Sequence, residues 1–197
     1  MSTGITLATK VTLVRLMGVP VFAVLLVYYT LGLARGESVD IYRRLALGFF
    51  IAVAATDALD GYLARSRNEI TRLGRFLDPL ADKTLLLSGL ILLTRPNLLQ
   101  LEPHIPIWFT ALVISRDVVL AVGYAIVHHF ATTVTVQPRI AGKIATVLQM
   151  AVIVWVLLQA PADYFYHLVA AAAAFTALAG VQYVLDGVRQ LDRGAKH

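Results

Sequence analysis

The chain has 197 residues, of which 58% are hydrophobic and 15% charged, and its formal net charge at pH 7 is +5. A soluble domain usually carries about 25% charged and about 45–50% apolar residues, so the composition excludes an ordinary soluble domain and predicts a polytopic membrane protein. Because the chain contains no cysteine, disulfides, thiolate metal sites and cysteine nucleophiles are excluded. In a membrane chain, a positive charge indicates cytoplasmic loops and anionic head groups rather than a nucleic-acid partner.

Six hydrophobic segments follow one another, each near the roughly 20 residues that cross a bilayer as a helix. They cover about residues 16–33, 45–63, 77–93, 107–127, 144–159 and 164–184. The sequence therefore predicts an all-α fold with about six transmembrane helices in a single membrane domain, residues 1–197.

The N-terminal region mixes apolar and polar residues at near-helical spacing over residues 5–14. This pattern predicts a short interfacial helix before the first span. The apolar run that follows Lys10 and Arg15 is about as long as a membrane span, so we expect an uncleaved anchor rather than a cleaved signal peptide.

Basic residues predict the orientation of the spans. With six spans, both termini share one side with the loops around residues 65–75 and 128–143, and this side collects most of the lysines and arginines. Its members are Lys10, Arg15, Arg65, Arg67, Arg72, Arg75, Arg139, Lys143, Arg189, Arg193 and Lys196. The other side has Arg35, Arg43, Arg44 and Arg95. The positive-inside rule then places both termini and the aspartate-rich loop in the cytoplasm.

Four aspartates flank the connector between the second and third segments. Asp57 and Asp60 are three residues apart, and Asp78 and Asp82 are four apart, so each pair lies on one face of a helix. The connector over residues 66–73 is short, which predicts antiparallel neighbouring helices whose four carboxylates converge.

Carboxylates this close repel one another and raise each other's pKa values unless a cation neutralises them. Two divalent ions would do so, and an all-oxygen ligand set favours Mg²⁺ or Mn²⁺ over zinc. The alternative is that the acids form salt bridges with nearby cations, a costly use of four carboxylates at the edge of a membrane. Those cations are Arg65, Arg72, Arg75 and Lys83.

Small residues accompany the aspartates. Gly61, Ala64 and Gly74 remove side-chain bulk, which lets a ligand lie against the backbone, and Arg65 adds a cation suited to phosphate. Two metal ions beside an arginine favour displacement at phosphorus. Taken separately, Gly61 or Ala64 would be an ordinary helix-packing residue.

The complete pattern resembles the signature of the CDP-alcohol phosphatidyltransferase family. It reads Asp57-x2-Asp60-Gly61-x2-Ala64-Arg65-x8-Gly74-x3-Asp78-x3-Asp82, with every fixed position and spacing of that signature matched. The resemblance extends to six spans in about 200 residues. It implies transfer of a phosphatidyl group from CDP-diacylglycerol to an alcohol, with release of CMP.

The resemblance also implies roles for single residues. The four aspartates, Asp57, Asp60, Asp78 and Asp82, would surround two divalent ions, Mg²⁺ or Mn²⁺. Asp82 would also be the general base that deprotonates the acceptor hydroxyl. The residues that would line the cytidine nucleotide are Gly61, Ala64, Arg65 and Gly74.

Three stretches outside the signature resemble the glycerol-acceptor branch of the family: "VTLVR" (residues 11–15), "ISRDV" (114–118) and "GKIATVLQ" (142–149). That branch contains phosphatidylglycerophosphate synthase, whose acceptor is glycerol 3-phosphate, and CMP-forming cardiolipin synthase, whose acceptor is phosphatidylglycerol. We expect glycerol 3-phosphate and keep phosphatidylglycerol as the alternative. "LATK" (residues 7–10) and Asp117 depart from the usual pattern of the first enzyme, and the "SRD" form is closer to the second.

Both acceptors carry a phosphate, so we expect cations beside the metal ions. The candidates are Arg116, Arg139 and Lys143. Arg116 and Asp117 could instead form a buried pair that fixes the fourth span to its neighbours. Arg139 and Lys143 could be no more than positive-inside residues.

Two other classes use similar residues. An intramembrane prenyltransferase also holds a diphosphate with aspartates and Mg²⁺, but such enzymes resemble longer chains with different aspartate spacing. A cation transporter would need its carboxylates near the bilayer midplane, whereas these flank a cytoplasmic connector. The family resemblance further implies a homodimer in a bacterial inner membrane, with the active site facing the cytoplasm.

Overall fold

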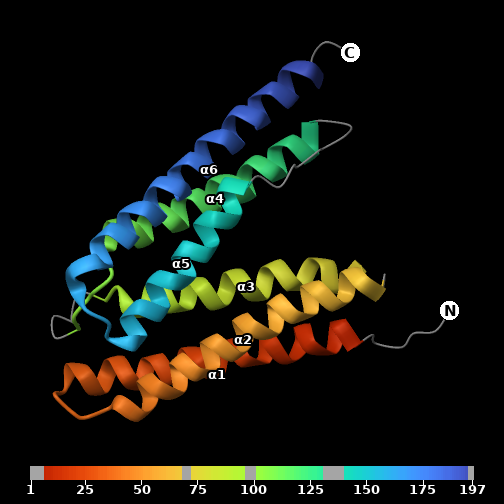
Figure 1. The fold of residues 1–197 in the computed structure, drawn as a ribbon. Helices are drawn as coiled ribbons and strands as arrows, with labels where there is room; N and C mark the ends of the chain where they lie inside the picture. Colours follow the sequence, from red (N-terminus) through yellow and green to blue (C-terminus); the bar gives the residue numbers. More distant parts are fainter. Residues whose placement is uncertain (1–6, 68–71, 96–100, 131–139, 195–197) are drawn as a thin grey trace. The chain divides into compact units, whose positions relative to one another are not determined.

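The computed structural model describes the backbone of residues 7–67, 72–95, 101–130 and 140–194. Described side chains are those of residues 17–56, 81–95, 101–123, 125 and 140–188. Regular structure in these ranges is helical, which confirms the all-α prediction. In chain order the helices are α1 (Leu7–Ala34), α2 (Asp40–Arg67), α3 (Arg72–Leu93), α4 (Ile107–Phe130), α5 (Ile140–Leu158) and α6 (Phe165–Gly194), with a 3₁₀ turn, η1 (Ala162–Tyr164), before α6 (Figure 1).

Each predicted hydrophobic segment falls on one of these helices, but most helices extend beyond the apolar segment, α1 at its N-terminal end and α6 at its C-terminal end by the most. Three stretches of the described chain are long and apolar enough to cross a membrane: Met17–Ala34, Ile140–Leu158 and Ala162–Val188. The count of six spans is therefore not confirmed. The separate interfacial helix is not confirmed either, because α1 is continuous from Leu7.

The chain divides into two compact units, which are described one at a time. Unit 1 comprises residues 1–104 together with Leu157–Gln159 at the end of α5. Unit 2 comprises residues 105–156 and 160–197.

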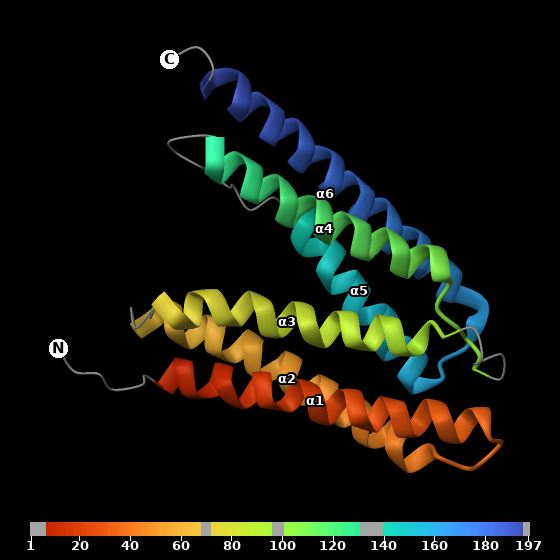
Figure 2. The same cartoon turned by 180° about the vertical axis from the view of Figure 1, so that it is seen from behind.

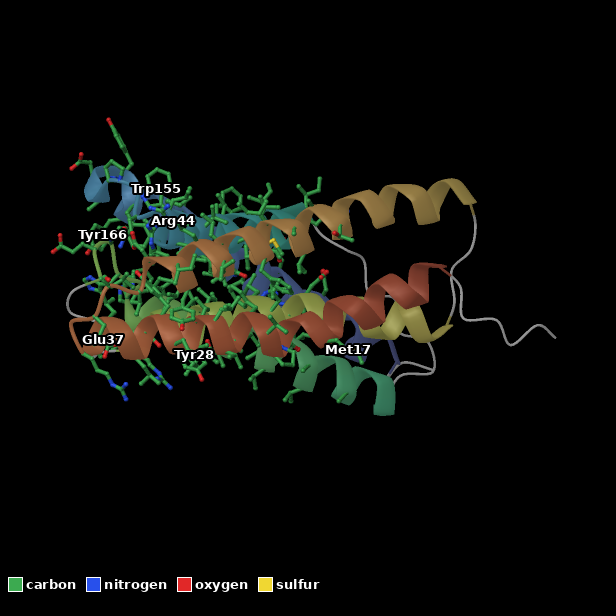
Figure 3. The ribbon with its side chains drawn as sticks, turned by 90° about the horizontal axis from the view of Figure 1, so that it is seen from below. Met17, Tyr28, Glu37, Arg44, Trp155 and Tyr166 are labelled. Atoms are coloured by element: carbon green, nitrogen blue, oxygen red, sulfur yellow. The ribbon has the colours of Figure 1, made fainter. Side chains whose placement is uncertain are left out.

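In unit 1, α1 packs against both α2 and α3. Figures 1 and 2 show α2 running in the opposite direction to the other two helices. Large side chains from all three helices are fully buried here: Phe22, Leu26 and Tyr29 from α1, Phe50 from α2, and Leu85, Leu86, Leu90 and Leu93 from α3. Exposed apolar side chains on α1 include Met17 and Tyr28 (Figure 3), as expected for a helix that faces lipid.

Two glycines let α1 and the start of α2 approach closely. A Cβ atom on Gly18 would lie 2.6 Å from Cζ of Phe49, and one on Gly32 would overlap the side chain of Val39. Small residues at helix contacts are a common device of membrane helices, where close backbone approach increases van der Waals contact. A larger residue at either position would force Phe49 or Val39 to shift.

The turn after α1 is a Schellman motif. Gly36 has a φ angle of 74°, and its N–H donates to the carbonyl of Leu33 while the N–H of Glu37 donates to the carbonyl of Gly32. These bonds pair carbonyl groups that the helix end would otherwise leave without a partner. Glycine suits the position because it adopts a positive φ without steric cost.

Arg43 of α2 is a buried charge among the described residues of unit 1. Its Nε donates to Oδ1 of Asp40 at 3.2 Å, and its Nη1 donates to the backbone carbonyl of Leu157 at the end of α5. The side chain of Arg43 is 10% exposed. A guanidinium that pairs the last carbonyls of a helix satisfies both groups and complements the negative end of the helix dipole.

In unit 2, α4 packs against α6, and the two run in the same direction (Figure 1). The buried apolar side chains of this unit include Phe109, Val113, Ala145, Val152, Ile153, Val156, Phe165, Val169 and Ala172. A buried hydrogen bond joins α5 to α6, because Nε2 of Gln149 donates to Oγ1 of Thr176 at 2.8 Å. Oγ1 of Thr176 in turn donates to the carbonyl of Ala172 at 2.6 Å.

We expect Arg43→Ala to lower the stability of the purified protein by about 1.5–3 kcal/mol, because it removes a charged donor from a buried carbonyl. The quantity to measure is the free energy of unfolding in detergent micelles. Arg44→Ala is the matched control: Arg44 makes only an exposed ion pair with Asp40, at 3.8 Å, and such pairs contribute roughly 0–1 kcal/mol. Equal losses in the two variants would show that the Arg43–Leu157 bond does not stabilise the fold.

Candidate active site

The four aspartates of the signature lie on helices, as predicted. Asp57 and Asp60 belong to α2, and Asp78 and Asp82 belong to α3. The side chains of Asp57, Asp60 and Asp78 lie outside the described residues. Asp82 is described and is partly exposed.

The backbone places the two pairs at matching levels. Asp57 lies ten residues before Arg67, the last residue of α2, and Asp82 lies ten residues after Arg72, the first residue of α3. At 1.5 Å per residue, both are about 15 Å along the axis from the connector ends of their helices. Asp60 and Asp78 are seven and six residues from the same ends.

The connector limits how far apart these helix ends can be. Only four residues, 68–71, join Arg67 to Arg72, so their Cα atoms are at most about 18 Å apart. With the two helices running in opposite directions (Figure 1), the backbone of Asp57 is level with that of Asp82, and the backbones of Asp60 and Asp78 lie nearer the connector. Four carboxylates and no sulfur or imidazole in the signature make a hard oxygen donor set, which suits Mg²⁺ or Mn²⁺.

The predicted nucleotide residues lie on the same two helices. Gly61, Ala64 and Arg65 follow the first aspartates on α2, and Gly74 lies in the first turn of α3. Their side-chain surroundings are outside the described residues. Their roles therefore stay predictions.

Of the predicted acceptor cations, Arg116 is described in most detail. Its Nη1 donates to Oδ1 of Asp117 at 2.8 Å, and the two side chains are 12% and 15% exposed. An Arg116–Asp117 ion pair is therefore present, within α4; that it fixes this helix to its neighbours stays a prediction. Nε of Arg116 is buried and has no hydrogen-bond partner among the described residues, so the pair leaves one donor of the guanidinium unsatisfied.

Glycines from two helices flank Arg116. A Cβ atom built on Gly142 of α5 would lie 3.2 Å from Nη2 of Arg116, and one on Gly180 of α6 would lie 3.4 Å from its Cγ. In the sequence, Gly142 belongs to a stretch that resembles the glycerol-acceptor branch, but the sequence predicted no role for Gly142 or for Gly180. Only the packing of three helices makes these glycines neighbours of one arginine.

The first turn of α5 gathers positive charge. The helix begins at Ile140 and has no acidic residue in its first turn, whereas Lys143 lies there and is exposed. Because the N-terminus of a helix carries a partial positive charge, a cation in this turn is unfavourable by roughly 0.3–1 kcal/mol. Arg116, in contact with Gly142, adds a second cation. Arg139 lies outside the described residues.

Comparison with known proteins agrees with the sequence pattern. The family model for CDP-alcohol phosphatidyltransferase matches residues 5–182. A Mycobacterium tuberculosis protein named "Probable phosphatidylglycerophosphate synthase" is 33% identical over 189 residues, which cover 94% of this chain and 83% of the relative.

Two further relatives are named CDP-diacylglycerol–glycerol-3-phosphate 3-phosphatidyltransferase. The Bacillus subtilis protein is 33% identical over 147 residues, covering 73% of this chain and 72% of its own length. The Salmonella typhimurium protein is 34% identical over 153 residues, covering 76% of this chain and 75% of its own length.

The Arg116–Asp117 pair generates a stability prediction. Asp117→Leu should destabilise the protein by about 3–5 kcal/mol, because it leaves a buried guanidinium without its counter-charge. The double variant Arg116→Met/Asp117→Leu should lose clearly less than Asp117→Leu alone, since no charge then stays buried. Unfolding in detergent measures both, and a double variant that loses the sum of the two single losses would contradict the paired arrangement.

Proposed function

The chain belongs to the CDP-alcohol phosphatidyltransferase family, and from that membership we propose that it transfers the phosphatidyl group of CDP-diacylglycerol to glycerol 3-phosphate. The products are phosphatidylglycerophosphate and CMP. The observation that carries this proposal is the match of residues 5–182 to the family model, together with the eight fixed residues of the signature on α2 and α3. The acceptor is supported by the names of the relatives.

The donor side of the reaction uses α2 and α3. Asp57, Asp60, Asp78 and Asp82 would hold two divalent ions, Mg²⁺ or Mn²⁺, whose charge would stabilise the diphosphate as its bond breaks. Gly61, Ala64 and Gly74 would leave room for the cytidine nucleotide beside the backbone. Arg65 would pair with a phosphate oxygen of the donor.

In the chemical step, the hydroxyl oxygen of the acceptor attacks the phosphorus of the phosphatidyl group. A new P–O bond forms, the P–O bond to CMP breaks, and CMP leaves with the electron pair. Asp82 would take the proton of the attacking hydroxyl, as a carboxylate within hydrogen-bond reach does in general base catalysis.

The acceptor side uses α4 and α5. Lys143 and Arg116 are two cations at the positive end of α5, without an acidic residue in its first turn. Helix N-termini bind phosphate readily, because free N–H groups and the helix dipole both favour an anion. The cost of crowding positive charge here is offset when a phosphate binds. Arg139, one residue before α5, would add a third cation.

Phosphatidylglycerol remains the second candidate acceptor, which would make the product cardiolipin. The observation that favours it is Asp117 directly after Arg116, the "SRD" form of the fourth segment. The protein is a membrane enzyme. We propose six spans, cytoplasmic termini and a cytoplasmic active site from the distribution of basic residues, and a homodimer in a bacterial inner membrane from the family resemblance.

The metal-binding role of the aspartates is tested by substitution. Asp57→Asn, Asp60→Asn, Asp78→Asn and Asp82→Asn should each reduce CMP release by at least about 100-fold, the usual loss when one electrostatic or proton-transfer element is removed. Asp163→Asn, in the exposed η1 turn, is the matched control and should keep wild-type activity. Near wild-type rates in any two of the four variants would refute the shared two-metal site.

The acceptor site is tested at Lys143, whose exposed side chain can be removed without opening a buried pair. Lys143→Ala should raise KM for glycerol 3-phosphate by about tenfold, in line with loss of one charge-assisted hydrogen bond. KM for CDP-diacylglycerol should change much less, because that substrate rests on α2 and α3. Arg35→Ala, which removes an exposed cation outside the helices, is the control. A wild-type protein that ignores glycerol 3-phosphate but converts phosphatidylglycerol would overturn the acceptor and leave the phosphatidyl-transfer chemistry in place.

A further inference from the structure

We propose that Gly142 is a positioning residue for the acceptor: its missing side chain is what lets the guanidinium of Arg116 lie against the first turn of α5, next to Lys143. This inference rests on the proposed function, because it assigns Gly142 to the phosphate end of the acceptor. The inference adds Gly142 to the proposed acceptor site, as a residue that neither contacts the reacting atoms nor carries charge.

Three residues lie around the side chain of Arg116. Gly142 stands so near that a Cβ atom would be 3.2 Å from Nη2, closer than most Cβ contacts in proteins. Gly180 bounds the aliphatic part of the side chain, with its own Cβ position 3.4 Å from Cγ. Asp117 holds Nη1 at 2.8 Å. Neighbouring residues therefore restrict both terminal nitrogens of Arg116, Nη1 and Nη2, and its aliphatic chain at Cγ.

A methyl group at Gly142 would have to displace the guanidinium rather than the backbone. The nearest atom is the far end of a flexible side chain, so the protein can still fold, and alanine is the better helix former by about 1 kcal/mol. The displacement is a few tenths of an ångström, and the ion pair with Asp117 resists it. Gly142→Ala should thus disturb the position of a charge while leaving the fold intact.

Binding of an anion would explain this arrangement of positive groups. Nε of Arg116 is buried and has no partner among the described residues, and Nη2 lies close to Gly142, the residue before Lys143 in the first turn of α5. Asp117 pairs with Nη1 of Arg116, and the first turn of α5 has no acidic residue. An acceptor phosphate would balance that charge, and a bidentate guanidinium contact depends on geometry as well as charge.

The experiment compares three glycine-to-alanine variants in the full-length protein in detergent, with CDP-diacylglycerol and glycerol 3-phosphate. Gly142→Ala should raise KM for glycerol 3-phosphate by about three- to tenfold, with kcat and KM for CDP-diacylglycerol nearly unchanged, as expected when ground-state and transition-state binding weaken together. Gly123→Ala in α4 is the matched control, since its new methyl would meet Cε1 of Tyr183 at 3.5 Å, an ordinary contact distance, and would not meet Arg116. Gly48→Ala is the second control, because nothing lies within 4 Å of its Cβ position.

A double-mutant cycle separates positioning from general damage. Arg116→Lys keeps a positive charge beside Asp117 but removes Nη2, the atom that Gly142 contacts. In the Arg116→Lys background, Gly142→Ala should change KM for glycerol 3-phosphate by less than about twofold, because coupled sites are non-additive. Additive effects would overturn the proposal, and so would a Gly142→Ala variant whose loss is in thermal stability or in kcat rather than in KM.

The outcomes distinguish this inference from the function on which it rests. Wild-type protein that does not use glycerol 3-phosphate overturns the proposed acceptor, and this inference with it. Wild-type protein that does use it, with unchanged KM in Gly142→Ala, overturns this inference alone. A KM rise that occurs in Gly142→Ala and is absent from Gly123→Ala and Gly48→Ala supports both.

Discussion

The cost of burying charge in an apolar helix bundle governs where the polar residues of this chain lie. A charged group taken out of water loses several kcal/mol unless it is paired and hydrogen-bonded. Arg43 meets this cost with Asp40 and the carbonyl of Leu157, and Arg116 meets it with Asp117. The bond of Arg43 also joins α2 to the end of α5, whereas the Arg116–Asp117 pair lies within α4.

The four aspartates are the opposite case. They lie on α2 and α3, and Asp57 and Asp82 are equally far along the backbone from the connector. Four carboxylates that met there would repel one another. In the proposed function, two divalent cations would make that arrangement favourable.

The cations proposed to bind the acceptor, Lys143 and Arg116, are a third case. Lys143 is exposed in the first turn of α5, where it gains little from the protein and opposes the helix dipole. Arg116 is paired, yet its Nε has no partner among the described residues. In the proposed function, an acceptor phosphate would supply the missing negative charge, and the cost to the free protein would be a cost of function.

Sequence alone determined the helices and the donor half of the reaction. Segments of about 20 apolar residues fix helix positions, because a chain in lipid must satisfy its backbone hydrogen bonds internally. The i, i+3 and i, i+4 spacings of the aspartates fix a shared helix face in the same local way. The fixed residues of the signature therefore identified the family before any fold was known, and the comparisons confirmed it.

Only the tertiary structure decided what surrounds Arg116. The sequence left two roles open for this residue, an acceptor ligand or a buried pair, because the choice depends on which helices pack against α4. Contacts with Gly142, Gly180 and Asp117 are set by residues on three helices, up to 64 positions apart in the chain. The periodicity of the sequence does not predict such contacts, because a glycine that packs against an arginine in the fold has the same sequence pattern as any other glycine in an apolar helix.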